Sequence, residues 1–211
     1  MRHALALRPS YSSKSLTNFG LLLATLLFAA CVLLLLPTAV SAQTVLLNAP
    51  NANGSFYGMY CVSCIGAQFT LNANYYVSTI DVVVRTPSNT SYTNFNFSLL
   101  SSVSPVTTVV SQTLSAPQGA VSTLVFTVNQ LLPAGTYYLV GNVPNYFGSQ
   151  VTAGDVDGWM ISTGTYSGTA GTITDGVGGF QGSNWVVNSS SGYHAPAFTV
   201  NGSTQIGRAH V

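Results

Sequence analysis

The sequence predicts an all-β fold: an antiparallel two-sheet β-sandwich, jelly-roll-like, with about ten short strands behind an N-terminal signal helix. Three observations predict it. Apolar and polar residues alternate along most of the chain after residue 42, which places successive side chains on opposite faces of a strand. Pro, Gly and Asn separate the alternating segments, as expected of turns between antiparallel strands. No window of this region has a convincing helical period.

The first 42 residues have the pattern of a secretory signal peptide. Cations at Arg2, Arg8 and Lys14 precede an apolar run at residues 21–36, and small residues up to Ala42 form a cleavage site. The run is shorter than the roughly 18 apolar residues of a membrane-spanning helix, and an uncleaved anchor would still leave the remainder outside. We therefore expect a secreted or cell-surface protein.

The last seven residues read QIGRAHV. The codons CAG-ATC-GGA-AGA-GCA-CAC-GTC, which would encode them, reproduce a widely used sequencing-library adapter. We interpret residues 205–211 as adapter read-through rather than native sequence, in which case a C-terminal anchor could have been lost; any other codon choice in the nucleotide record would refute this. Residues 43–204 are then expected to form a single β-sandwich domain.

The exported region carries very few charges. Arg85 is its only Lys or Arg and stands against four aspartates, so one minus four gives a net charge of minus three. Nucleic acids and anionic membrane surfaces bind clustered cations, so we expect no nucleic-acid partner, and membrane contact only through the signal segment or a C-terminal anchor. The aspartates are Asp81, Asp155, Asp157 and Asp175.

The first three strands are expected at residues 44–48, 66–71 and 75–85. A polar break at residues 72–74 separates the second from the third. Residues 49–54 are rich in turn formers and are expected to be a turn. Two sets of apolar side chains are expected to face inward. They are Ala67, Phe69 and Leu71 before the break, and Ile80, Val82 and Val84 after it.

The following strands are expected at residues 94–99, 107–114, 121–128 and 136–141. Phe95, Phe97 and Leu99 are expected to face inward and Asn94, Asn96 and Ser98 outward. Leu124, Phe126 and Val128 share one side of their strand, and Tyr137 and Leu139 alternate with Tyr138 and Val140. Three more strands, at residues 158–162, 184–187 and 195–200, are separated by loops, of which residues 164–182 are notably rich in glycine.

Several of these segments resemble the bacterial exported β-sandwich proteins of the choice-of-anchor type, which often carry a PEP-CTERM sorting tail. No Pro-Glu-Pro tail occurs in this sequence, and none of the matching segments is a catalytic motif. The resemblance implies a non-enzymatic structural or adhesive role at the cell surface or in the extracellular matrix, with surface polysaccharide or matrix components as partners. The matching segments are residues 66–71 (GAQFTL), 77–81 (VSTID), 97–99 (FSL), 132–140 (LPAGTYYLV) and 196–202 (PAFTVNG).

Cys61 and Cys64 form a CxxC pair. No His follows Cys64 for haem attachment, and no second pair completes a zinc site. The segment that follows is a predicted strand, whereas a thioredoxin-like redox site places its first cysteine at the start of a helix. We predict a small local disulfide, formed in an oxidising compartment.

Asp155, Asp157 and Gly158 are similar to the start of a calcium loop, in which alternating carboxylates and a glycine arrange oxygen ligands around the ion. A full loop needs further oxygens and a distal bidentate acid, and the sequence contains no glutamate. Two interpretations stay open: a calcium site at Asp155 and Asp157, or a plain Asp-Gly turn, which is the commoner use of this pair. No other cofactor is expected.

Trp159, Trp185 and Tyr146 lie in or beside loops of the C-terminal third. Exposed aromatic rings could stack on sugars, and the domain would then be a carbohydrate-binding module. Core packing is the alternative, because both tryptophans alternate with polar neighbours. His194 could belong to a Ser-His-Asp set, but the sequence has no Gly-x-Ser-x-Gly nucleophile elbow. We therefore expect no catalytic residues.

Overall fold

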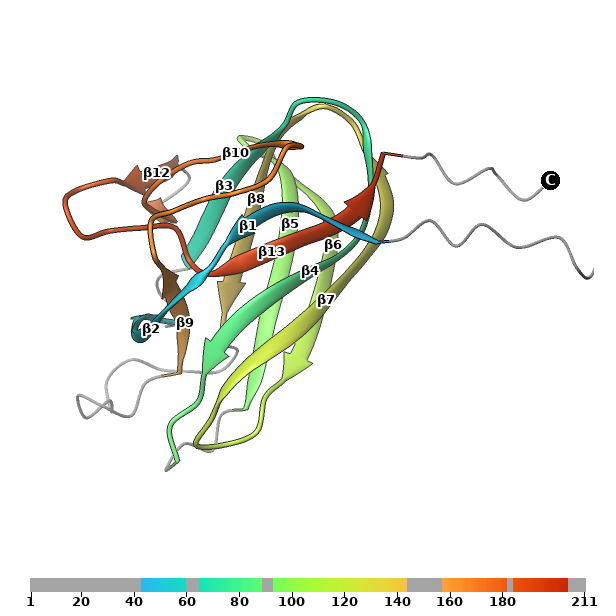
Figure 1. Cartoon of the computed structure of the whole chain (residues 1–211). Helices are drawn as coiled ribbons and strands as arrows, with labels where there is room; N and C mark the ends of the chain where they lie inside the picture. The colour runs from blue at the N-terminus through green and yellow to red at the C-terminus, as the bar shows by residue number, and fades with distance from the viewer. Residues whose placement is uncertain (1–42, 60–64, 89–92, 144–156, 182–183, 205–211) are drawn as a thin grey trace, which may run out of the picture. The chain divides into compact units, whose positions relative to one another are not determined.

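The computed structural model describes residues 43–59, 65–88, 93–143, 157–181 and 184–204. In these residues it contains thirteen β-strands and no helix, and the strands form two antiparallel sheets (Figure 1). The all-β prediction is thus confirmed; within the described part there is also no helix that could cross a membrane. Four predictions concern residues outside the described ranges. They are the signal segment, the Cys61–Cys64 disulfide, the roles of Tyr146 and Asp155, and the read-through at residues 205–211.

The first sheet has six strands in the order β1–β13–β4–β9–β2, with β7 on the opposite edge of β4. β13 and β9 use the same edge of β4 in succession: β13 pairs with β4 as far as Val82, and β9 pairs with it from Val84. Its strands are β1 (Thr44–Ala49), β2 (Asn51–Gly58), β4 (Tyr75–Arg85), β7 (Val121–Leu132), β9 (Gly158–Ser162) and β13 (Phe198–Ser203).

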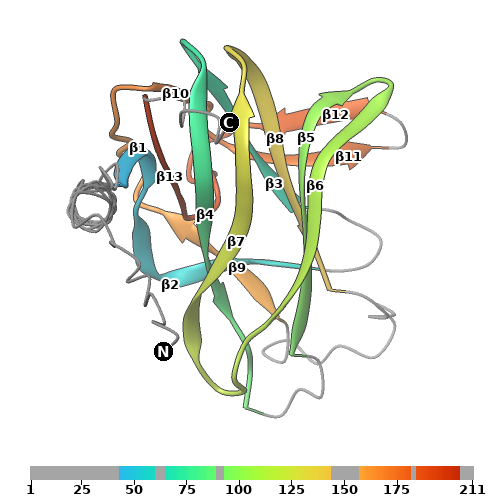
Figure 2. The ribbon, with the colours of Figure 1, turned by 90° about the vertical axis from the view of Figure 1, so that its right-hand side faces the viewer.

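The second sheet has seven strands in the order β12–β11–β3–β8–β5–β6, and β10 also pairs with β3. In Figure 2, β5 and β6 of this sheet lie on the same side of the sandwich as β7, an edge strand of the first sheet. There Gln112 of β6 accepts a hydrogen bond from the backbone N–H of Thr127 at 3.0 Å, which joins the two edge strands. The strands are β3 (Ile65–Leu71), β5 (Asn94–Val103), β6 (Val106–Ser115), β8 (Gly135–Asn142), β10 (Gly171–Ile173), β11 (Val177–Gln181) and β12 (Asn184–Asn188).

The core of the sandwich lies between the two sheets. Phe97 of β5 meets Trp159 of β9 edge to face, with ring centroids 5.0 Å apart, and Phe69 of β3 lies 5.8 Å from Phe198 of β13. All the side chains predicted to face inward are buried, none more than 8% exposed. The predicted strand faces are therefore confirmed.

The polar break at residues 72–74 carries the chain from one sheet to the other. β3 before it belongs to the seven-stranded sheet, and β4 after it belongs to the six-stranded sheet. Asn72 accepts a hydrogen bond from the Tyr75 hydroxyl at 2.9 Å, and Asn74 accepts one from the backbone N–H of Ala134 at 3.0 Å. The Asn74 bond ties this crossing to the connection between β7 and β8, while the Asn72 bond stays within the crossing.

Three observed strands, β2, β10 and β11, occupy residues predicted to be turns or loops. The register of β2 shifts between Asn51 and Phe56, and Gly54 has a φ of 125°, so the strand lacks a regular alternation. In β11, Gly178 and Gly179 pair with β3 but have no side chains that could show a period. The predictions of a turn at residues 49–54 and of a glycine-rich loop at residues 164–182 were therefore wrong where β2, β10 and β11 form.

Candidate functional site

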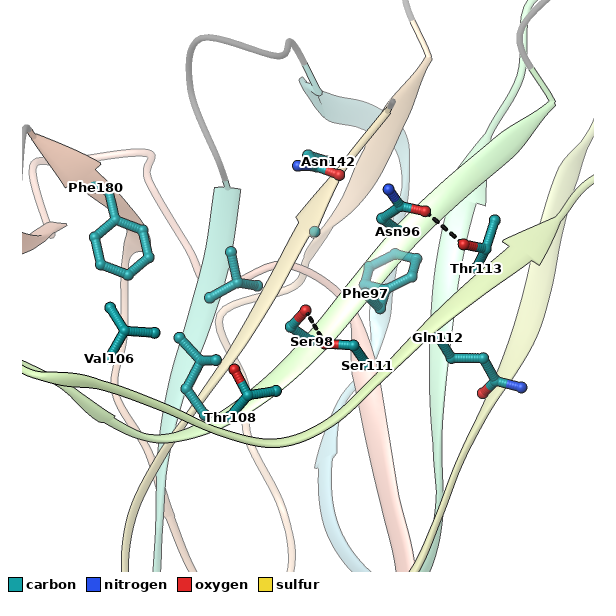
Figure 3. Close-up of a pocket in the computed structure, with 13 residues that line it drawn as sticks. Asn96, Phe97, Ser98, Val106, Thr108, Ser111, Gln112, Thr113, Asn142 and Phe180 are labelled. Atoms are coloured by element: carbon teal, nitrogen blue, oxygen red, sulfur yellow. Dashed lines mark hydrogen bonds between the residues drawn. The ribbon is translucent and has the colours of Figure 1, made fainter. Parts of the chain in front are cut away.

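A groove of about 490 Å³ lies on the outer face of the seven-stranded sheet (Figure 3). It forms there because Phe95, Phe97 and Leu99 of β5 point into the core, so the residues between them point outward. β5, β6 and β8 supply most of the lining, and β11 adds Phe180 at one end. The volume is within the usual range of small-ligand sites.

Polar side chains form one part of the lining as rungs between β5 and β6. The Thr113 hydroxyl donates to Oδ1 of Asn96 at 2.7 Å, and the hydroxyls of Ser98 and Ser111 lie 2.6 Å apart. The first bond uses the oxygen of Asn96 and leaves its NH₂ group as a donor. In the Ser98–Ser111 pair one O–H is the donor, so the other O–H and the remaining lone pairs can meet a ligand.

Apolar side chains form the other part. Phe180 of β11 and Val106 of β6 lie near each other at one end of the groove (Figure 3), and Val106 is 58% exposed. Leu100 and Val140 point outward from their strands but are nearly covered, at 4% and 7% exposed. The groove therefore combines a polar floor with an apolar end.

No Asp, Glu, Lys, Arg or His is among the residues that line the groove. Arg85, the one Arg in the described part, lies on the other sheet with its guanidinium 4.7 Å from the centre of the Phe56 ring. A charged ligand that entered the groove would lose hydration without gaining an ionic partner. A neutral ligand rich in hydroxyl groups would meet matching donors, acceptors and apolar surface.

A second cluster joins His194 and Asp175, whose Nδ1 and Oδ1 atoms lie 3.1 Å apart. The Tyr166 hydroxyl donates to the same oxygen of Asp175 and accepts from the backbone N–H of Ala195 at 3.0 Å. Burial works to raise the pKa of the Asp175 carboxyl, but the hydrogen bonds from Tyr166 and His194 outweigh it and hold that pKa below its usual value.

This second cluster lacks a nucleophile. Within the described residues the ring of His194 bonds only to Asp175, and no Ser, Thr or Cys donates to it. Its contacts instead tie the segment before β13 to the loop after β9, through Tyr166 and the backbone N–H of Ala195, and to β2, through the Tyr57 hydroxyl and the backbone N–H of His194. The cluster therefore serves to hold the loops around Tyr166, Asp175 and His194 together.

Asp157 is a third feature. It is 1% exposed, and neither carboxylate oxygen has a hydrogen-bond partner among the described residues. Burial raises the pKa of the Asp157 carboxyl to about 7. The described residues contain no group of three His, Cys, Asp or Glu that could hold a metal ion. Because Asp155 lies outside them, the calcium site at Asp155 and Asp157 stays a prediction.

The structure separates the two tryptophans that were candidate glycan contacts. Trp159 is fully buried and donates from Nε1 to the backbone oxygen of Ala197 at 2.8 Å. Its ring offers no exposed face to a sugar, so the glycan contact predicted for Trp159 was wrong and the residue packs in the core. Trp185 is half-buried and lies against Phe180, outside the lining of the groove.

The sequence reasoning missed every residue that does line the groove. Asn96 and Ser98 were assigned only to the outward face of a strand, which is correct but does not distinguish a site from ordinary surface. Phe180 was placed in a glycine-rich loop. An aromatic residue beside Gly178 and Gly179 was the one signal that could have directed attention there.

Comparisons with known proteins give little support to any assignment. No family model matches the chain, and no curated protein matches it. Among solved structures, the chain is similar to one of infectious bursal disease virus, Gt strain, with 12% identity and a TM-score of 0.29. That match covers 81% of this chain but 40% of the viral chain, and its TM-score is too low to carry an argument.

Proposed function

We propose that this chain is a non-enzymatic exported β-sandwich that acts at a cell surface or in an extracellular matrix by binding polysaccharide in the groove on β5, β6 and β8. The export signal, the choice-of-anchor resemblance and a jelly-roll-like topology belong to the same proposal. The observation that carries it is the lining of the groove: neutral amides and hydroxyls on the floor, apolar side chains at one end, and no ionisable group.

The chemistry of a pyranose ring matches this lining. Its edge carries hydroxyl groups, which both donate and accept hydrogen bonds, and its faces carry C–H groups that pack on apolar side chains. The Asn96–Thr113 and Ser98–Ser111 rungs offer donors and acceptors in the open, while Phe180 offers an aromatic face. Nucleic acid fits poorly, because its phosphates would find no cation in the groove.

Hydrolysis of a bound glycan is not part of the proposal. Most glycoside hydrolases place two carboxyl groups on either side of the bond that is cut, and the residues that line the groove include none. The Asp175–His194 pair belongs to another set of loops, and its one hydroxyl partner within the described residues is the phenol of Tyr166, with no Ser or Thr bonded to the His194 ring. Binding without turnover is what this lining supports.

The test is direct binding of neutral oligosaccharides. The chain secreted by an expression host is titrated with cellohexaose, mannohexaose and maltohexaose by calorimetry, and the recovered oligosaccharide is checked for unchanged length. Thr113→Val removes one hydroxyl of the floor and is expected to weaken binding by about five- to tenfold, since it leaves the Asn96 oxygen without that donor. Thr123→Val, on the exposed face of β7 in the other sheet, is the matched control. Failure of the unmodified protein to bind any of the three oligosaccharides would refute the proposal.

A further inference from the structure

Trp185 lies over a strip of the seven-stranded sheet that has no side chains. Gly66 of β3 and Gly178 of β11 pair with each other there. A Cβ atom at Gly178 would lie 2.0 Å from Cζ2 of Trp185, and one at Gly66 would lie 2.6 Å from its Cη2 atom. Neither glycine has a positive φ, so the need for glycine is steric rather than conformational. The two glycines form a seat for this indole.

From this seat Trp185 supports Phe180. The two residues are direct cross-strand partners between β11 and β12, and their rings meet at 81° with centroids 5.3 Å apart. On another side the indole meets Tyr138 of β8 at 69° and 5.2 Å. Edge-to-face contacts of this kind are favourable. The indole also occupies space into which the Phe180 ring could otherwise rotate. Trp185 thus restricts Phe180 to a position at the end of the groove.

We propose that Phe180 is the stacking platform of the groove for the apolar face of a neutral pyranose, and that Trp185, seated on Gly66 and Gly178, positions it. This inference rests on the proposed function and names the ligand surface that it uses. Phe180 is half-buried and lies beside Val106 at the groove end (Figure 3). A sugar ring stacked there would direct its hydroxyls toward the polar rungs of Ser98 and Asn96.

The same geometry selects against acidic sugars. No cation lines the groove, so a uronic acid carboxylate would be desolvated beside Phe180 and Val106 without an ionic partner. Neutral chains are therefore the class that the platform accepts. Oxidation of the ligand at C6 changes a hydroxymethyl group to a carboxylate on the same backbone, and this gives a matched pair of probes.

The experiment measures Kd for whichever of the three neutral hexasaccharides binds the unmodified chain, and for the same oligosaccharide oxidised at C6. Phe180→Ala is expected to weaken binding of the neutral probe by about tenfold or more, as removal of an aromatic anchor does. Phe180→Leu keeps bulk without an aromatic face and is expected to lose most of the same affinity. The oxidised probe is expected to bind at least about tenfold more weakly than the neutral one. Tyr193→Ala, which removes an exposed aromatic ring outside the groove, is the control.

The role of Trp185 is tested by a double-mutant cycle. Trp185→Phe is expected to weaken binding about threefold or more in the unmodified background and not at all in the Phe180→Ala background, because it acts through Phe180. A general loss of structure would weaken binding in both backgrounds. Binding by the unmodified chain with an unchanged Kd for Phe180→Ala would overturn this inference and leave the proposed function standing. Absence of binding by the unmodified chain would remove both.

Discussion

Replacing Asp157 by Asn should remove most of the pH dependence of stability between pH 5 and pH 8. The carboxyl is buried at the start of β9 without a partner among the described residues, and burial raises its pKa from 3.8 to about 7. The nearest charged residue along the paired strands is Arg85, opposite Gly158, but its guanidinium lies over the Phe56 ring. Within the described part it forms no ion pair with Asp157.

The sign follows from the direction of the shift. The folded state holds the Asp157 proton more tightly than the unfolded state, so the stabilisation is fully present below pH 3.8 and is lost as the pH rises through about 7. A shift of about three pKa units corresponds to about 4 kcal/mol in total, of which about 3 kcal/mol falls between pH 5 and pH 8. Asn cannot ionise, so its profile lacks this contribution.

Urea unfolding of the unmodified chain and of Asp157→Asn, measured at steps from pH 5 to pH 8, provides the assay. The difference between their unfolding free energies should change by about 3 kcal/mol in favour of Asn as the pH rises. Asp81→Asn is the control, because it removes another carboxylate, which accepts a hydrogen bond from the neutral Asn201 amide and has no His partner among the described residues. Parallel profiles for the unmodified chain and Asp157→Asn would refute the reasoning.

The same variant separates the calcium prediction from the buried neutral acid. A calcium ion bound through Asp157 would require the ionised carboxylate, so calcium would raise the melting temperature most at high pH. Asp157→Asn would abolish that rise. A melting temperature that is unchanged by calcium or by a chelator at pH 8 would remove the metal site and leave Asp157 as an unpaired buried acid.

Three further predictions concern the fold. Phe69→Ala should lower the unfolding free energy by about 3 to 5 kcal/mol in urea titrations, because it empties a fully buried site between the sheets; a near-neutral result would contradict the assignment of the inward face. Gly178→Ala should destabilise by about 1 to 3 kcal/mol and shift tryptophan fluorescence, since its Cβ would overlap Trp185; unchanged stability and emission would show that the seat is not tight. Cys61 and Cys64 should resist thiol labelling of the unfolded exported chain until a reductant is added, and their reduction should lower stability by about 2 kcal/mol; labelling before reduction would exclude the disulfide.

Alternation along single strands allowed much of the fold to be predicted. Phe95, Phe97 and Leu99 could be assigned to the core because the faces of a strand follow from a period of two residues, which depends only on the backbone. The same local rule placed Asn96 and Ser98 on the outside. It failed in β11, because Gly178 and Gly179 have no side chains to reveal a period.

The sequence by itself thus determined that this is an all-β chain, which side chains fill its core, and that residues 43–204 are nearly uncharged. Only the tertiary structure decided that Asn96, Thr113 and Phe180, from three different strands, line one groove, and that Trp159 is enclosed while Trp185 lies against Phe180. The reason is that strand order and register are long-range properties. They depend on which segments pair and on what covers each face, and neither is encoded in the period of a single strand.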